Sequence, residues 1–349
     1  MINKSFFSTE ILRWFRENGR DLPWRETRDP YAIWLSEIIL QQTRIAQGWE
    51  YWERFMQTYP KVEDLAAASE DDVLKLWQGL GYYSRARNLH TAAKQIVALG
   101  DFPNTLEGIK SLKGVGDYTA AAIGSFAFDI PAAVVDGNVY RVLSRYFGID
   151  TPINSTQGKK EFAALAQSLL PASDAASYNQ GMMDFGAIQC TPQSPKCLLC
   201  PLAETCEALR CGRVEELPVK NKTVKVKTRH LSYIYIRCKS SAADGAGKSE
   251  PMVAIHRRGE GDIWQGLWEP YNVSDVKELP SFVKNPVLLA KDVKHVLTHR
   301  ILLADFYLLE TESRPRLPDD YIWIKESEIE DYGVPRLIEI MLEKINPAE

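Results

Sequence analysis

The chain has 349 residues, of which 45% are hydrophobic and 25% are charged, and its formal net charge is −4. The length predicts about two domains, and the composition is typical of a globular protein. No apolar run approaches the ~18 residues that a membrane helix needs, and the start of the chain lacks the apolar segment of a signal peptide. We therefore expect an intracellular protein. The negative net charge counts mildly against a nucleic-acid partner, although a local groove can still be positive.

Amphipathic stretches separated by short turn signals predict that residues 1 to about 211 are almost entirely helical. In one stretch, 138–147, Val139, Val142 and Tyr146 fall on one helix face. The composition changes near Thr223. Basic residues there alternate with small or polar ones, which predicts a basic linker at 213–229. Strands are expected at 232–237, 252–256, 287–290, 301–309 and 321–324, and a last helix at 335–345. The predicted fold is multidomain: an all-α domain (1–212) followed by an α+β domain (230–349).

The first candidate catalytic residue is a carboxyl group on an apolar helix. Glu37 has Ile33, Trp34 and Leu40 as neighbours at helical spacing, so it is expected to be buried. Burial raises the pKa of a carboxyl group and keeps a proton available near neutral pH, as a general acid requires. The alternative is a structural glutamate paired with an arginine such as Arg44.

Two closely spaced glycines join two helical stretches. Gly114 and Gly116 let the turn approach another surface closely, and Asp117 or Thr119 can cap the next helix. The N–H groups at that helix start would suit a phosphate. The pattern is that of a helix–hairpin–helix DNA-binding motif, and an ordinary helix–helix turn is the alternative that the local sequence leaves open.

A second carboxyl group, Asp136, precedes the helix that is expected to begin near Asn138. The simplest interpretation is a helix cap. A carboxylate at a helix start is also favoured as an anion by the helix dipole and the backbone N–H groups. A protonated Glu37 and an ionised Asp136 would form the complementary pair that cleavage of a glycosidic bond requires.

Four of the six cysteines form a C-x6-C-x2-C-x5-C pattern at Cys190, Cys197, Cys200 and Cys206. Four thiolates in one short loop can surround a single metal centre, and both zinc and an iron–sulfur cluster accept such ligands. The spacing favours iron–sulfur, because zinc sites more often pair two C-x2-C motifs across a longer gap. Cys211 and Cys238 lie outside the pattern.

Together these motifs resemble the adenine DNA glycosylases, the MutY family of the helix–hairpin–helix glycosylase superfamily that also includes endonuclease III. The segments that carry the resemblance, over about residues 8–211, are Trp34–Glu37 with Gln41–Thr43, Gly79–Tyr83, Leu112–Gly116, Val135–Val139 and the four-cysteine loop. The resemblance implies a [4Fe-4S] cluster held by the four cysteines. It also implies a six-helix subdomain at about 28–134 and a cluster subdomain made of 1–27 and 135–212.

The implied activity is hydrolysis of the N-glycosidic bond of adenine opposite 8-oxoguanine or guanine in double-stranded DNA, as part of base excision repair. Glu37 would protonate the departing adenine, and Asp136 would stabilise the sugar cation or bond with it. Asn138 and Tyr118 match residues that position these groups. An AP lyase activity is not expected, because Tyr118 stands where strand-nicking relatives carry a lysine. A monomer in a bacterial cytoplasm is expected.

Gln42 and Tyr82 match residues that enter the DNA stack beside the lesion, as expected of an enzyme that flips a base out. For Tyr82, ordinary core packing is the alternative. Gly114 and Gly116 would contact the DNA backbone.

The second domain resembles, more weakly, the Nudix-like domain that reads 8-oxoguanine in this family. Gly266–Pro270 matches the Nudix scaffold, but the glutamate-rich catalytic box does not follow, so magnesium-dependent hydrolysis is not expected. The family's Phe-Ser-His recognition loop aligns with Leu297, Thr298 and His299. Thr298 and His299 are therefore candidate DNA-binding residues, while Leu297 lacks the aromatic ring. The alternative for His299 is a structural strand residue.

Three other functions compete with this one. An endonuclease III-like glycosylase would need the lysine that Tyr118 replaces, and it would not need residues 230–349. A non-catalytic iron–sulfur protein would leave Glu37 and Asp136 unexplained. A Nudix hydrolase would need the absent catalytic box.

Overall fold

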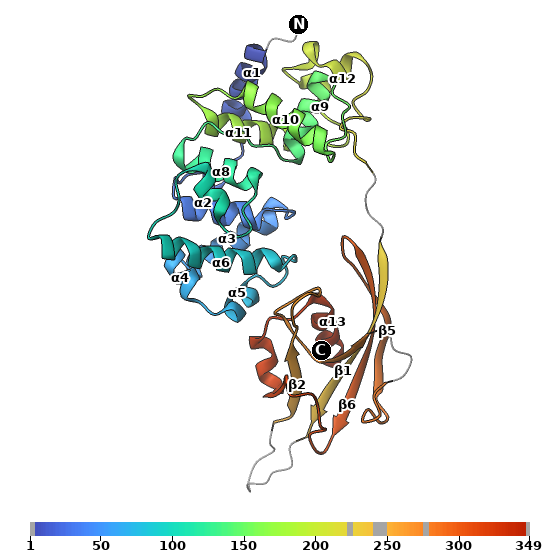
Figure 1. The fold of residues 1–349 in the computed structure, drawn as a ribbon. Coiled ribbons are helices and arrows are strands. Elements are labelled where there is room, and N and C mark those ends of the chain that lie inside the picture. The colour runs from blue at the N-terminus through green and yellow to red at the C-terminus, as the bar shows by residue number, and fades with distance from the viewer. Residues whose placement is uncertain (1–3, 222–225, 240–249, 275–278, 347–349) are drawn as a thin grey trace. The chain divides into compact units, whose positions relative to one another are not determined.

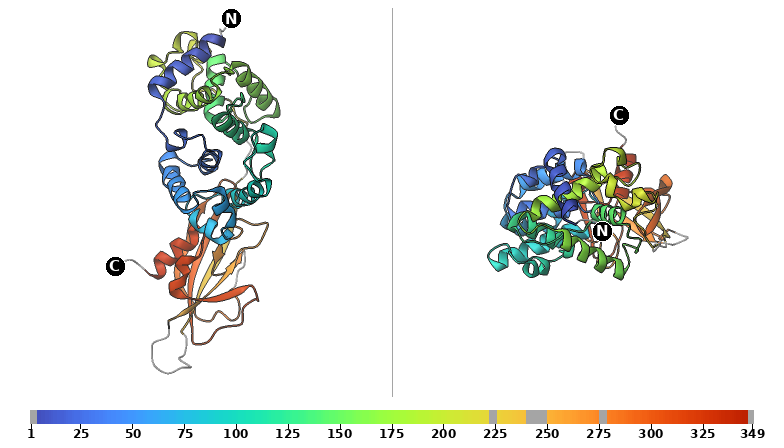
Figure 2. Two further views of the ribbon diagram at one scale, coloured as in Figure 1. Left: turned by 90° about the vertical axis from the view of Figure 1, so that its left-hand side faces the viewer. Right: turned by 90° about the horizontal axis from the view of Figure 1, so that it is seen from above.

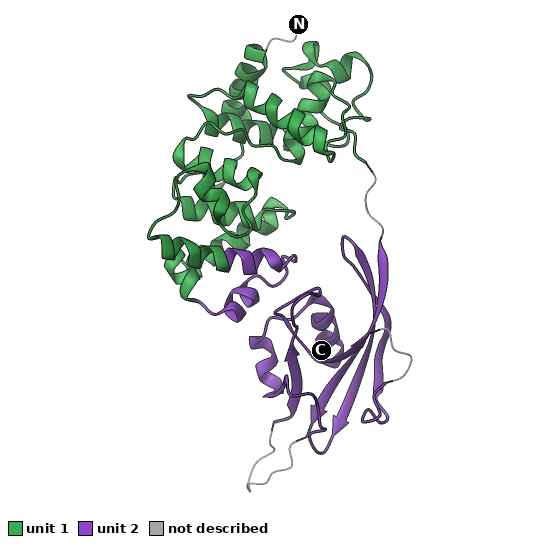
Figure 3. Cartoon of the chain, in the orientation of Figure 1, with its two compact units in different colours: residues 1–67, 91–222 green, residues 68–90, 223–349 purple. Residues whose placement is uncertain are grey.

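The computed structural model describes residues 4–221, 226–239, 250–274 and 279–346 (Figure 1). Contacts divide the chain into two compact units, shown in Figure 3: unit 1 is Met1–Ala67 with Thr91–Lys222, and unit 2 is Ala68–His90 with Thr223–Glu349. The predicted basic linker, 213–229, lies partly outside the described residues. The predicted domain boundaries stay a prediction, and contacts group Ala68–His90 with the C-terminal part of the chain.

Unit 1 is helical, as expected. Its elements are α1 (Lys4–Asn18), η1 (Pro23–Arg25), α2 (Pro30–Ile39), α3 (Ile45–Thr58), α4 (Val62–Ala67), the later part of α6 (Ser84–Leu99), α7 (Leu106–Ser111), α8 (Asp117–Phe128), α9 (Gly137–Phe147), α10 (Thr156–Leu169), α11 (Ala175–Asp184), η2 (Phe185–Gln189), η3 (Cys197–Leu199), η4 (Ala203–Thr205) and α12 (Glu207–Arg210). Within the described residues, no helix is long and apolar enough to cross a membrane.

Helix α2 lies at the centre of one helical group, where it packs against α8 and α3. Asp29 begins the helix by accepting a hydrogen bond from the Tyr31 N–H at 3.0 Å, and every residue from Tyr31 to Ile39 is buried. A helix that is apolar on all sides is stable only inside a core. The sequence of α2 therefore places the Glu37 side chain among apolar groups.

A second helical group forms around α9, which packs with α10, α11 and η2, while α1 packs against α10 and α11 (Figure 1). The predicted apolar face of α9 is confirmed, because Val139, Val142 and Tyr146 are all buried in one core cluster. Each such side chain contributes roughly 1.5–3 kcal/mol through burial. This packing fixes the start of α9, where Asp136 lies.

Unit 2 is built on one sheet with the strand order β3-β2-β1-β6-β5, in which β4 also pairs with β1 and β7 with β2. The strands are β1 (Lys227–Cys238), β2 (Met252–Arg257), β3 (Trp268–Glu269), β4 (Tyr271–Ser274), β5 (Val287–Val296), β6 (Arg300–Thr311) and β7 (Tyr321–Lys325); the helices are α5 (Glu70–Leu76), the first part of α6, η5 (Glu326–Asp331) and α13 (Arg336–Ile345). The five predicted strands and the last helix are confirmed. The short strands β3 and β4 were not predicted.

Helix α13 covers one face of this sheet (Figure 2), and Leu337, Ile338 and Met341 form a core there with strand residues such as Tyr233 and Phe306. Polar contacts join segment Ala68–His90 to the rest of unit 2. The Arg257 guanidinium donates to Glu70 at 2.8 Å, and Lys75 donates to the Tyr332 carbonyl at 3.3 Å. The α+β architecture expected from the alternating patterns is therefore present.

Candidate active site and cysteine loop

Glu37 lies on α2 with only 6% of its surface exposed. The Tyr118 hydroxyl, from the second residue of α8, donates a hydrogen bond to Glu37 Oε2 at 2.8 Å. Burial raises the pKa of Glu37 to about 7; the Tyr118 hydrogen bond acts in the opposite direction, and the charge of Asp136 adds to the rise. The hydrogen-bond partner of Glu37 is thus Tyr118 and not Arg44, and the carboxyl group can hold a proton near neutral pH.

Asp136 caps α9, as the simplest interpretation predicted. Its Oδ1 accepts from the Val139 N–H at 2.7 Å, and its Oδ2 accepts from the Asn138 amide at 2.7 Å. Burial of the carboxyl group nevertheless raises its pKa above the ordinary value, although these hydrogen bonds and the charge of Arg141 oppose the rise. The hydrogen bonds at the helix start favour the anion as expected, but desolvation outweighs them in the pKa of Asp136.

Arg25 is a residue of this site that the sequence analysis missed. Its positive charge lowers the pKa of Glu37. The guanidinium donates to both oxygens of Asp184 at 2.8 Å, and Asp184 is fully buried. Arg20 donates to the same carboxylate. No local pattern marks Arg25, because its importance comes from a partner far away in the sequence.

The two-glycine hairpin joins α7 to α8. Gly114 has a φ of +79°, which favours glycine, and Gly116 is the N-cap of α8. The prediction that Asp117 or Thr119 caps α8 is wrong: Asp117 pairs with Lys110, and the buried Thr119 hydroxyl accepts from Gln41 at 3.3 Å. No side-chain hydrogen bond caps this helix, and a Cβ at Gly116 would meet nothing within 4 Å. The amide groups at the start of α8 are therefore accessible to a ligand.

Gln42, in unit 1, and Tyr82, in unit 2, share an uncommon backbone conformation. Their φ angles are +58° and +46°, in a region that side chains other than glycine rarely adopt. Tyr82 is 46% exposed, whereas its neighbour Tyr83 is 7% exposed. Core packing therefore explains Tyr83 and not Tyr82. Such strained, exposed residues are common at functional sites.

Thr298 and His299 lie at the exposed tip of a tight turn between β5 and β6. The turn is closed by the Leu297 N–H, which donates to the Arg300 carbonyl at 2.8 Å. The Thr298 hydroxyl is hydrogen-bonded to the Tyr82 hydroxyl. Leu297 instead packs against the core beneath α13. His299 is not a strand residue, so that alternative is wrong, and the tip presents two polar side chains to the exterior.

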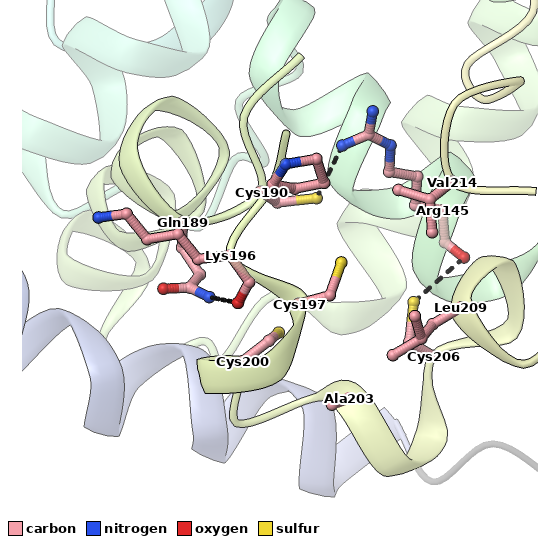
Figure 4. Close-up of a pocket in the computed structure, with 11 residues that line it drawn as sticks. Arg145, Gln189, Cys190, Lys196, Cys197, Cys200, Ala203, Cys206, Leu209 and Val214 are labelled. Atoms are coloured by element: carbon pink, nitrogen blue, oxygen red, sulfur yellow. Dashed lines mark hydrogen bonds between the residues drawn. The ribbon is translucent and has the colours of Figure 1, made fainter. Parts of the chain in front are cut away.

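The four cysteines of the predicted metal loop surround one hollow, which Arg145 also lines (Figure 4). All four are free thiols. Burial raises the pKa of Cys200 to about 12 and that of Cys206 above its ordinary value, and the neighbouring thiols add to the rise. Such thiols become thiolates only when a strong positive centre binds them. Four thiols that line one hollow are the donor set that an iron–sulfur cluster takes.

Arginines hold this loop against α9. Arg145 donates to the carbonyl of Thr191 at 2.7 Å and contacts Cys190 Sγ at 3.5 Å. Arg141 donates from Nε to the Cys190 carbonyl at 2.8 Å and from Nη2 to Asn138 Oδ1 at 2.8 Å. One guanidinium thus connects the first cysteine with the partner of Asp136.

Models of known protein families match three segments of this chain. The model of the HhH-GPD superfamily base excision DNA repair proteins matches residues 35–171, the iron–sulfur binding domain of endonuclease III matches 190–206, and a NUDIX domain matches 247–344. An adenine DNA glycosylase of Buchnera aphidicola subsp. Acyrthosiphon pisum is 31% identical over 354 residues, which cover 98% of this chain and 98% of that protein. The chain belongs to the adenine DNA glycosylase family.

Other members of the adenine DNA glycosylase family match different shares of the chain, and one from Buchnera aphidicola subsp. Schizaphis graminum is 30% identical and covers 97% of it. The mouse protein is 43% identical over 226 residues, which cover 61% of this chain and 44% of that protein. Among solved structures, a thermostable thymine-DNA glycosylase is similar with a TM-score of 0.56 and 34% identity, covering 60% of this chain and 97% of that one. The predicted family, the iron–sulfur loop and the Nudix-like domain are confirmed.

Proposed function

We propose that this family member is a monofunctional glycosylase that hydrolyses the bond between adenine and deoxyribose where adenine is paired with 8-oxoguanine or guanine. The observation that carries the proposal is the Glu37 carboxyl group, which is buried and hydrogen-bonded to Tyr118, and whose pKa is raised by burial to about 7. A group with this pKa is half protonated at neutral pH, so it can give a proton to a leaving base.

In the proposed reaction, Glu37 donates its proton to a ring nitrogen of adenine. The glycosidic bond then breaks, and its electron pair leaves with the base. Ionised Asp136 faces the positive charge that develops on the sugar, and its two hydrogen bonds from Val139 and Asn138 keep the anion oriented. A water molecule beside Asp136 and Asn138 attacks the sugar carbon, and the proton that it loses returns to the Glu37 carboxylate, which restores the site.

The proposed product is an intact strand with an abasic site. A strand-nicking relative needs an amine that forms a Schiff base with the sugar. Tyr118 occupies that position, and its hydroxyl is engaged with Glu37 while burial raises its pKa well above 10. A phenol in this state is not a nucleophile at neutral pH and cannot form an imine.

Double-stranded DNA is the proposed partner, bound by a monomer. The uncapped start of α8 at Gly116 and the positive-φ turn at Gly114 support a phosphate contact there, because helix N-termini attract anions. The exposed side chains of Gln42 and Tyr82 would occupy the space left by a flipped base. Thr298 and His299 would contact the base opposite adenine.

The four cysteines Cys190, Cys197, Cys200 and Cys206 would hold the iron–sulfur cluster in its four-iron form. When bound, the cluster would offset part of the negative charge of the four thiolates and would join the segments of the loop that follows η2. The protein's own contribution is the pair Arg141 and Arg145, which hold the loop backbone in place.

The test is a set of three labelled duplexes, carrying an A:8-oxoguanine pair, a G:T mismatch or thymine glycol, each incubated with the protein and then treated with alkali. We expect scission only at adenine, and only after alkali. Glu37→Gln should abolish this scission, whereas Glu63→Gln, at an exposed position in α4, is the matched control and should leave it unchanged. Cleavage at thymine, at thymine glycol or without alkali would contradict the proposal.

A further inference from the structure

The polar turn Leu297–Arg300 is held at its base by a residue from a different loop. Arg300 follows the two exposed tip residues directly, and its guanidinium donates to Asp262 Oδ1 at 3.3 Å. On the other side, the Lys227 N–H donates to the His299 carbonyl at 3.2 Å. Asp262 is 38 residues away from Arg300 in the chain, so this contact exists only in the folded unit.

The Asp262 carboxylate accepts hydrogen bonds from three arginine side chains. Arg229 donates to it at 2.6 and 2.8 Å, and Arg258 donates to it at 2.8 Å, in addition to Arg300. Arg258 is 8% exposed and also pairs with the buried Glu269 at 2.6 Å. Because like charges repel, three guanidinium groups can converge here only around a carboxylate. Asp262 is the residue that allows Arg300 to lie beside the other two.

The loop that carries Asp262 is itself well fixed. Its ends are joined by the Arg258 N–H, which donates to the Leu267 carbonyl at 2.8 Å, and by the Gly266 N–H, which donates to the Arg258 carbonyl at 2.9 Å. The Ile263 N–H donates to Asp262 Oδ1 at 2.7 Å, which sets the orientation of the carboxylate. The contact with Asp262 therefore connects the turn Leu297–Arg300 to a loop of unit 2 that its own hydrogen bonds hold in place.

We propose that Asp262 is a positioning residue that, through Arg300, fixes the Thr298–His299 tip for discrimination between 8-oxoguanine and guanine opposite adenine. The proposal rests on the proposed function of that tip. Asp262 holds the turn from its base, and the Tyr82 hydroxyl holds Thr298 from its end. A hydroxyl and an imidazole can distinguish bases that differ by one oxygen and by the position of one hydrogen only if these side chains are held closely in place.

The experiment compares Asp262→Asn, Arg300→Ala and the double variant in the full-length protein. Excision is measured in single turnover on duplexes with A:8-oxoguanine and with A:G, together with the affinity for each duplex. We expect each single variant to lower the preference for 8-oxoguanine about tenfold and to change the rate on A:G by less than about twofold. The double variant should lose no more than Asp262→Asn alone, because both substitutions act on the contact between Asp262 and Arg300. Arg300→Lys should restore part of the preference, since it keeps the charge.

The matched control is Glu326→Gln, which removes a comparable half-buried ion pair with Arg237. Arg237 lies ten residues beyond Lys227 on β1, roughly 33 Å along the strand. This variant should keep the full preference for 8-oxoguanine. If Asp262→Asn does not fold, Arg300→Ala decides the question, because it leaves the other pairs of Asp262 in place.

An unchanged preference in Arg300→Ala, or an equal loss of rate on both duplexes, would overturn the positioning role. If the unmodified protein excises no adenine or shows no preference, the proposed function itself fails. The two failures are therefore distinguishable.

Discussion

The rate of adenine excision is expected to fall as the pH rises through about 7, because Glu37 must carry a proton to act as the acid. Burial raises the pKa of this group from 4.5 to about 7. A carboxyl group with that pKa is roughly nine-tenths protonated at pH 6 and about one-tenth protonated at pH 8. At pH 7, about half of the molecules carry the proton, which is roughly 150 times the fraction for an ordinary glutamate. The difference corresponds to about 3 kcal/mol.

The assay is single-turnover excision from an A:8-oxoguanine duplex between pH 5.5 and 9. The enzyme concentration is kept too low to saturate the DNA, so that the pH profile reports ionisation of the free enzyme. The rate should fall about tenfold for each pH unit well above 7. Tyr118→Phe removes the hydrogen bond that lowers the pKa of Glu37, so its fall should begin at higher pH. A rate that stays constant or rises between pH 6 and 8.5 would refute the assignment of Glu37 as the acid.

Four further predictions follow from the same contacts. Glu37 has a folded-state pKa above its unfolded value, so it contributes stability that is present below about pH 4.5 and is lost as the pH rises to about 7. The free energy of unfolding of the wild type, measured with urea, should therefore fall by up to about 3 kcal/mol over that range relative to that of Glu37→Gln. Parallel curves of unfolding free energy against pH would contradict this. Asp136→Asn should keep the helix cap, since asparagine caps equally well, and should lose at least about a hundredfold in excision rate, as measured in single turnover. Cys197→Ser should lower both the iron content and the yield of folded protein; full iron content would remove Cys197 from the ligand set. Tyr118→Lys should gain some strand nicking and become trappable on DNA by borohydride, whereas an equally trappable wild type would overturn the monofunctional interpretation.

Much of the site could be predicted because its residues lie in strong local patterns. The unbroken apolar helix around Glu37, the cap at Asp136 and the cysteine spacing are each visible within a few neighbouring residues. The Tyr118–Glu37 hydrogen bond joins residues 81 positions apart and depends on how α8 packs against α2. The resemblance to a family indicated Tyr118 only as a positioning residue, and its hydrogen bond to Glu37 could be identified only from the fold.

Other features depend on burial and tertiary contacts, which a single sequence does not display. The pKa of Asp136 rises because desolvation exceeds the hydrogen bonds, and local sequence reveals only the hydrogen bonds. The salt bridge between Arg25 and Asp184 spans 159 positions. Strands β3 and β4 contain too few residues for an alternating pattern to be recognised. The grouping of Ala68–His90 with unit 2 likewise depends on contacts, such as Arg257 with Glu70, that join distant parts of the chain.

The hydrogen bonds of Arg141 connect the chemistry at Asp136 with the cysteine loop. A guanidinium group can only donate hydrogen bonds, so Asn138 must turn its oxygen toward Arg141 and its N–H group toward Asp136. The same guanidinium is held by the carbonyl of Cys190, the first cysteine of the loop. Arg141 also donates to the Gly186 carbonyl at 2.6 Å, so movement of the loop would remove one of its acceptors and weaken its hold on Asn138, the donor that favours the ionised form of Asp136. In the proposed mechanism, the position of the cysteine loop would therefore influence the charge that Asp136 presents to the sugar.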